Sequence, residues 1–124
     1  MKSQNFRKGK LGEQIAGDYL TKKGYRIIRQ NFQTRFGELD IIAAKDNFLV
    51  FIEVKLKIGT AFGRPEEMIT QKKLSQIKNT AEMFLRREKT HLYNFKQYRI
   101  DAICIILNQD MGVKEIRHYE NITG

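Results

Sequence analysis

This 124-residue chain contains only one cysteine, one proline and two histidines, and it has no tryptophan. The lone Cys104 has no partner for an internal disulfide, and the first ten residues contain no apolar leader, so we expect a cytoplasmic protein. No run of about 18 apolar residues is present, so we expect no membrane span. With so few histidine and cysteine ligands, a structural zinc site is not expected.

Acidic residues are also in deficit, because 23 lysines and arginines face 14 aspartates and glutamates and leave a net charge of +9. Such a charge favours polyanionic partners, nucleic acid first and an anionic membrane surface second. The alternative is that the charge only keeps the protein soluble. The chain has no repeat or linker-like segment, so we predict one domain spanning residues 1–124.

The pattern of apolar residues predicts an α/β fold with the element order αβββαββ and a mixed sheet of about five strands flanked by helices. A helix is expected over residues 9–23, stopped by Gly24, and a second long helix after Thr70 as N-cap. The strand at 98–107 is apolar on both faces and is therefore expected to be central. The predicted strands cover residues 25–34, 38–44, 48–56, 98–107 and 113–119.

The stretch "GELDIIAAKDNFLVFIEVK", residues 37–55, places Glu38, Asp40, Glu53 and Lys55 in the strands of a predicted hairpin, although strands are usually poor in acids. If residues 46–47 form a two-residue turn, paired positions sum to 93, and Asp40 lies opposite Glu53 with Cβ atoms about 5 Å apart. Lys55 then shares their face. A three-residue turn would shift the sum to 92 and break this pairing.

Two facing carboxylates repel each other unless something neutralises them. A hard divalent cation such as Mg²⁺ does so, because it binds carboxylate oxygens together with water and phosphate oxygens. Lys55 would stabilise charge on an attacked phosphate or help to deprotonate the attacking water. The same few residues would thus bind a metal and cut a phosphodiester.

"GELD" followed by "FIEVK" is similar to the PD-(D/E)XK signature of restriction-endonuclease-like nucleases. Nearly the whole chain resembles the uncharacterised bacterial YraN-like family, which in turn resembles archaeal Holliday junction resolvases. The matching segments are "GKLGEQIAGDYLTKKGYRIIRQN", "GELDIIA", "LVFIEVK", "FGRPEE", "QKKL" and "YRIDAI". This resemblance implies a restriction-endonuclease-like core and Mg²⁺ or Mn²⁺ as cofactor. It also implies metal ligation by Asp40, Glu53 and Glu13, with Lys55 as the catalytic lysine.

Several other residues have two interpretations at this point. Glu13 lies at the edge of the apolar face of its helix, which allows either a place in the site or ordinary solvation. Gln71 and Lys72 open the second long helix, and they and Lys57 are candidates for phosphate contact. For Lys72 a solvated charge is an equal alternative.

We expect Glu38, which follows a predicted turn at residues 35–37, to face away from Asp40 and to be solvated, although the family motif includes it. Asp101 lies in an apolar strand and needs a partner if it is buried. We expect a structural ion pair with Arg99, two residues away. Both histidines, His91 and His118, are expected on the surface.

These patterns predict a metal-dependent endonuclease that hydrolyses phosphodiester bonds in DNA, with branched or structured DNA as the substrate class. The first alternative is a nucleic-acid-binding module that keeps the nuclease fold without catalysis and acts in recombination or DNA processing. The second is an RNA-associated basic protein without a metal site. Because the similar resolvases are dimers, the resemblance allows a homodimer, although no unpaired apolar stripe demands one.

Overall fold

The computed structural model describes residues 4–59, 69–88 and 95–123, the side chains of residues 4–7 excepted. The order of its elements confirms the predicted αβββαββ arrangement. The elements are α1 (Gln4–Lys22), β1 (Arg26–Thr34), β2 (Gly37–Lys45), β3 (Phe48–Ile58), α3 (Gln71–Arg87), β4 (Gln97–Leu107) and β5 (Val113–Tyr119). Helix α1 begins five residues before the predicted start, and β3 continues to Ile58.

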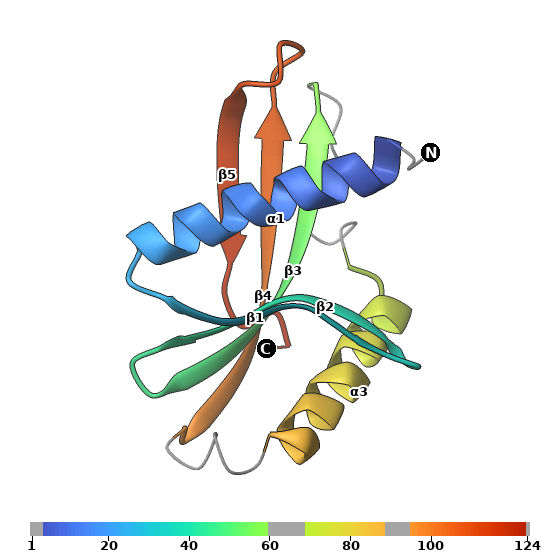
Figure 1. The fold of residues 1–124 in the computed structure, drawn as a ribbon, viewed down its shortest axis with the longest axis vertical. Coiled ribbons are helices and arrows are strands. Elements are labelled where there is room, and N and C mark those ends of the chain that lie inside the picture. The colour runs from blue at the N-terminus through green and yellow to red at the C-terminus, as the bar shows by residue number, and fades with distance from the viewer. Residues whose placement is uncertain (1–3, 60–68, 89–94, 124) are drawn as a thin grey trace.

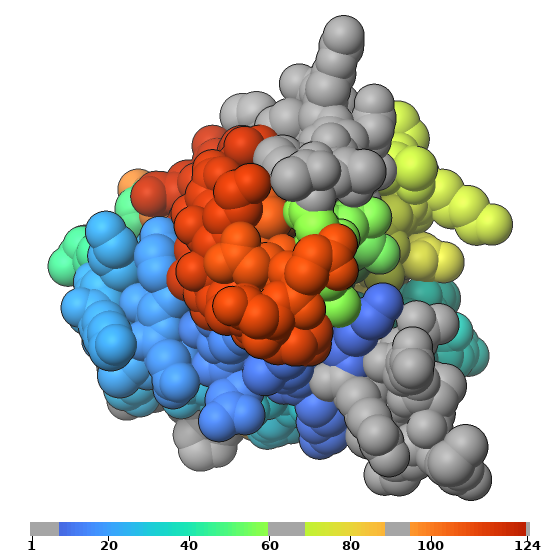
Figure 2. Space-filling view, turned by 90° about the horizontal axis from the view of Figure 1, so that it is seen from above, coloured from blue at the N-terminus to red at the C-terminus, as the bar shows by residue number. Residues whose placement is uncertain are grey.

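The five strands form one mixed sheet in the order β1-β2-β3-β4-β5 (Figure 1). Strands β3 and β4 are parallel, and every other neighbouring pair is antiparallel. Helix α1 covers one face of the sheet and α3 the other, which the view from above in Figure 2 shows as α1 and α3 on opposite sides of β3. The site described below lies where both helices approach β2 and β3.

A separate apolar cluster lies on each face of the sheet. Burial of these side chains supplies the main driving force for folding. Strand β4 contributes Ile103 and Ile105 to the cluster beneath α1 and Ile100 to the cluster beneath α3, which confirms its predicted central place. The buried Cys104 lies on the same strand.

The ends of the two helices follow from local sequence. Gly24 has a φ of 94°, a backbone conformation that favours glycine, and the Tyr25 amide donates to the Leu20 carbonyl at 2.9 Å to close α1. Thr70 caps α3 as predicted, since its hydroxyl accepts from the Lys73 amide at 3.1 Å. Within the described ranges, no helix has the length and apolarity needed to cross a membrane.

Candidate metal centre

The turn between β2 and β3 has the two residues that the sequence predicts. Lys45 pairs with Phe48, and the register continues to Ile41 and Ile52, so paired positions sum to 93. The paired positions end one short of Asp40 and Glu53. There the Asp40 Oδ2 atom accepts from the Val54 amide at 2.8 Å, so a side chain replaces a backbone carbonyl at the end of the ladder.

Near Asp40 on β2, and at the facing position of β1, the regular alternation of side chains between the two faces of the sheet is interrupted. Ile41 packs in the cluster beneath α1, whereas Leu39, two residues away, packs in the cluster beneath α3. A regular strand would put both on one face. In β1, Asn31 lies between the partners of these two residues and has a φ of 55°, in the left-handed region that asparagine tolerates better than most residues. At this irregularity, an oxygen of Asp40 lies within 4.8 Å of one from Glu13 on α1.

Three acids from two elements meet at this point. Glu13 on α1 and Glu38 and Asp40 on β2 each offer one oxygen, and these oxygens all lie within 4.8 Å of one another. The side chains are half-buried, and they line a cavity of about 450 Å³ together with Lys10 and Asn31 among others. Because divalent cations bind oxygens at about 2.0–2.6 Å, one ion between the three carboxylates fits this spacing.

The expectation that Glu38 faces away from Asp40 was wrong. The two residues are two positions apart on β2, a spacing that shares a side on a regular strand, and their oxygens lie within 4.8 Å of each other despite the irregularity at Asp40. The Glu38 carboxylate also accepts from the Gln33 side-chain amide at 3.5 Å across the hairpin. The two-residue spacing of Glu38 and Asp40 was therefore the sequence signal that Glu38 belongs beside Asp40.

Glu53 reaches Asp40 from β3, and the interaction between the two carboxyl groups acts to raise the pKa of Glu53 and to lower that of Asp40. Burial raises the pKa of Glu53 to about 7, the charge of Asp40 adds to this rise, and Lys73 opposes it. Burial also raises the pKa of Asp40, against the hydrogen bond from the Val54 amide. The pKa of Glu13 is raised by burial and then by the charge of Asp40. Without a cation, this cluster favours binding protons.

Lys73 on α3 is a member of this site that the sequence reasoning missed. Its Nζ atom lies 3.3 Å from Glu53 Oε2. The sequence pattern drew attention to its neighbours Gln71 and Lys72 but not to Lys73. It stands four residues before the buried Ile77, however, and residues four apart lie on the same side of a helix. Helical spacing was therefore enough to place it toward the sheet.

The remaining predicted residues lie on β3 and in the first turn of α3. Lys55 is exposed on β3 and its charge acts to lower the pKa of Asp40. Gln71 and Lys72 are exposed in the first turn of α3, and Lys57 is half-buried near the end of β3. The roles assigned to these four residues, and to the metal ligands, stay predictions.

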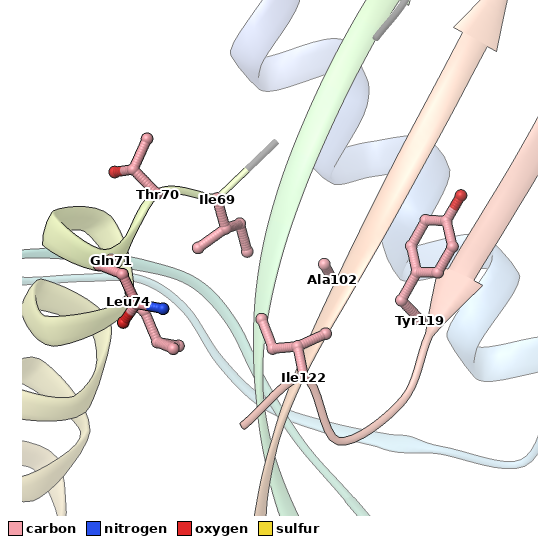
Figure 3. A pocket seen from close by; sticks show the side chains of 7 residues that line it. All are labelled: Ile69, Thr70, Gln71, Leu74, Ala102, Tyr119 and Ile122. Atoms are coloured by element: carbon pink, nitrogen blue, oxygen red, sulfur yellow. The ribbon is translucent and has the colours of Figure 1, made fainter. Parts of the chain in front are cut away.

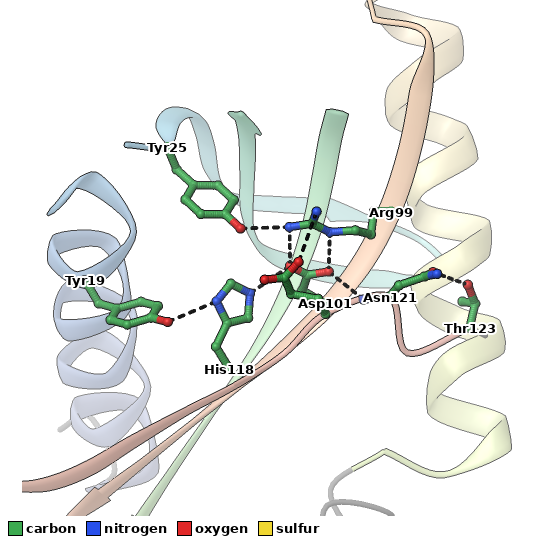
Figure 4. A network of polar contacts seen from close by, with 8 residues as sticks. Tyr19, Tyr25, Arg99, Asp101, His118, Asn121 and Thr123 are labelled. Carbon is green, nitrogen blue, oxygen red and sulfur yellow. Dashed lines mark hydrogen bonds and ion pairs between the residues drawn. The ribbon is translucent and has the colours of Figure 1, made fainter. Parts of the chain in front are cut away.

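Asp101 is fully buried on β4 and has the predicted ion pair with Arg99 (Figure 4). The Arg99 Nε and Nη2 atoms donate to its two oxygens at 2.8 and 2.9 Å. Burial acts to raise the pKa of Asp101, but hydrogen bonds from His118, Arg99 and the Asn121 amide outweigh it and lower the pKa. The carboxylate therefore stays charged inside the fold.

The surface position expected for His118 was wrong. Its side chain is 8% exposed, and its Nε2 atom lies 2.7 Å from Asp101 Oδ2. Its Nδ1 atom lies 3.2 Å from the Tyr19 hydroxyl on α1, while Arg99 also donates to the Tyr25 hydroxyl at 2.7 Å (Figure 4). This network fastens α1 to β4 and β5. The other histidine, His91, lies outside the described residues.

Comparison with known proteins places the chain in a family. The model of an uncharacterised protein family, UPF0102, matches residues 12–105, a range that includes all four acids of the site. A UPF0102 protein of Syntrophomonas wolfei is 39% identical over 113 residues, which are 91% of this chain and 94% of that protein. A UPF0102 protein of Clostridium botulinum is 44% identical over 100 residues, 81% of this chain and 80% of the relative. A UPF0102 protein of Persephonella marina is 43% identical over 107 residues, 86% and 90% of the two chains. The chain therefore belongs to the uncharacterised protein family UPF0102, the YraN-like family that its motifs resemble.

Proposed function

We propose that this protein is a metal-dependent nuclease that hydrolyses phosphodiester bonds in branched or otherwise structured DNA. One observation carries the proposal: Asp40 stands where acids from three elements meet. Its oxygens approach those of Glu13 and Glu38, and its carboxyl group interacts with that of Glu53, whose pKa is raised to about 7. Buried carboxyl groups are costly to gather, and a cation that binds between them offsets that cost.

The donor set fits Mg²⁺ or Mn²⁺, because every donor is a carboxylate oxygen and both cations accept such ligands. Asp40, Glu13 and Glu38 would hold the cation, and Glu53 would join them after it loses its proton. A cation bound there supplies Lewis acidity and lowers the pKa of a coordinated water molecule. The spacing of Asp40, Glu53 and Lys55 on neighbouring strands is similar to the PD-(D/E)XK signature, which supports the assignment to that nuclease superfamily.

The protein's own residues would then do three things. The acids would hold the cation to which the phosphate binds. Lys55, exposed on the strand that carries Glu53, stabilises negative charge as it develops on the attacked phosphate. Lys73, 3.3 Å from Glu53, would compensate the charge of that acid once it is ionised and would do the same for a phosphate oxygen.

The ion pair between Lys73 and Glu53 also supports a second candidate function. It neutralises one acid without a cation, as expected for a nucleic-acid-binding module that keeps the fold and has no catalysis. Such a module would bind DNA in a salt-sensitive way, would cleave nothing, and would keep its affinity when Asp40 is changed. The nuclease hypothesis requires cleavage that depends on Asp40.

The test is a cleavage panel with labelled four-way-junction, flap, single-stranded and duplex DNA, and matching RNA, in Mg²⁺ or Mn²⁺. We expect cleavage of a branched substrate and a loss of at least about 100-fold in rate for Asp40→Asn, since it removes the shared ligand. Asp46→Asn is the matched control. It removes one exposed carboxylate from the far end of the same hairpin, where φ is 54° and asparagine is tolerated. Cleavage that persists in Asp40→Asn, or is absent with every substrate, contradicts the nuclease proposal.

A further inference from the structure

A second cavity, of about 460 Å³, lies on the face of the sheet opposite α1 (Figure 3). It lies between the start of α3, strand β4 and the segment that follows β5. The residues that matter for its chemistry are Ile69, Gln71, Leu74, Ala102, Tyr119 and Ile122. Its volume falls within the range of pockets that hold small organic groups, about 300–1,000 Å³.

This cavity adjoins the acid cluster through the register of the sheet. Glu53 on β3 is aligned with Ala102 on β4, and Ala102 is aligned with Tyr119 on β5. Neighbouring strands are about 4.8 Å apart, so these three residues form one row across the sheet. On the helix side, Leu74 directly follows Lys73, which contacts Glu53. A ligand in the cavity would therefore lie next to a phosphate bound at the acids.

The walls of the cavity suit a flat ring with polar edges. Leu74, Ile122 and the ring of Tyr119 are half-buried and supply apolar surface on several sides (Figure 3). Gln71 adds an amide that both donates and accepts hydrogen bonds. The Tyr119 hydroxyl is engaged by Arg117, which leaves the face of its ring as the contact surface. Aromatic rings that stack bases are the usual means of holding unpaired nucleotides.

The next row of the same sheet carries positive charge. Lys55 is aligned with Cys104, and Cys104 is aligned with Arg117, so two cations flank β4 two residues beyond the cavity row, and Arg117 is also ion-paired with Glu115. Together with the net charge of +9, these cations favour a ligand that carries phosphates. A lipid chain would use neither the cations nor the Gln71 amide, and an apolar peptide would not use the cations.

We infer that this cavity receives an unstacked nucleobase, held against the Tyr119 ring, from the strand whose phosphate lies at Glu53. This inference rests on the proposed function for the position of that phosphate. It narrows the substrate class to nucleic acid with an unpaired or extruded nucleotide, such as a junction, a flap or a single strand. A continuous duplex would have to expose a base before it could occupy both sites, which costs unstacking energy.

The test compares two labelled single-stranded oligonucleotides of equal length, one with normal bases and one with abasic residues at its centre. Binding is measured by fluorescence anisotropy in EDTA, so that no cleavage occurs. We expect the wild-type protein to bind the abasic strand roughly 5- to 150-fold more weakly, the range of one base stacked on an aromatic ring. Tyr119→Ala should bind both strands alike, whereas Tyr119→Phe keeps the ring and should keep the difference.

Equal affinity of the wild-type protein for the two strands overturns the inference, and so does a full difference in a folded Tyr119→Ala. The wild-type comparison needs no variant, so the inference stays falsifiable if Tyr119→Ala does not fold. The cleavage panel gives a separate result. If the protein cleaves no substrate but binds the normal strand more tightly than the abasic one, only the nuclease proposal is overturned. If it cleaves DNA but binds the two strands alike, only the inference about the cavity is overturned.

Discussion

Glu53 shows how the environment of a single residue determines whether its carboxyl group is protonated or charged. Its carboxyl group is largely withdrawn from solvent, hydrogen-bonded to Asp40 and 3.3 Å from Lys73. Burial and the neighbouring acid favour its protonated form, while Lys73 favours the charged one. A cation or a proton can satisfy the pair of acids, so proton release and metal binding should be linked.

This linkage predicts how stability changes with pH in the metal-free protein. The folded pKa of Glu53, about 7, lies above its ordinary value of 4.5. The folded state therefore binds more protons between these values, and the free energy of unfolding should fall as pH rises from about 4.5 to 7. We expect Glu53→Gln to remove a contribution on the order of 1–3 kcal/mol to that fall. Urea unfolding in EDTA at pH 5 and pH 8 measures it.

The control for this prediction is Glu82→Gln, which changes an exposed acid on α3. It should keep the pH dependence of the wild-type protein. A Glu53→Gln variant whose stability falls across the same window as steeply as that of the wild type would show that Glu53 is not protonated in the folded protein.

At the scale of elements, polar contacts fasten α1 to the sheet and so hold Glu13 in place. Gly12, next to Glu13, packs so closely on β3 that an added Cβ would lie 3.4 Å from the Leu56 Cβ atom. Farther along α1, Tyr19 contacts His118, which contacts the buried Asp101. The position of Glu13 thus depends on contacts far from the acid cluster.

Asp101→Asn should therefore destabilise the fold by about 3–5 kcal/mol, because it leaves the Arg99 guanidinium with a neutral partner in a buried place. The pKa of Asp101 is lowered, so its contribution is present above its ordinary pKa of 3.8 and is lost as pH falls through the lower folded value. Urea unfolding at pH 7 measures the change. Asp110→Asn, in the exposed turn between β4 and β5, is the control and should cost less than about 1 kcal/mol. A similar cost for both variants would contradict this structural role.

Across the whole molecule, the sequence predicted the parts of the fold that depend on local patterns. The element order, the two-residue turn after Lys45 and the cap at Thr70 follow from alternation, helical spacing and capping chemistry, and all are confirmed. The early start of α1 did not follow, because its first turn contains no acid and little apolar periodicity.

The site was predictable to a smaller extent, for two different reasons. The positions of Glu38 and Lys73 in the site follow from their spacing along a strand and a helix, and that spacing was interpreted wrongly. The contact between His118 and Asp101 was not recoverable, because it depends on how β4 pairs with β5 and on which face α1 covers. The left-handed backbone at Asn31 was likewise not predicted from the sequence.

The central claim is that Asp40 is the shared ligand of a cation site, and a calorimetric titration of the protein with Mn²⁺ tests it most directly. We predict saturable binding by the wild-type protein and by Asp46→Asn, and a loss of at least about tenfold in affinity for Asp40→Asn. Binding should strengthen between pH 6 and pH 8 as Glu53 loses its proton. No heat of binding in the wild-type protein, or equal affinity in Asp40→Asn, would contradict the claim.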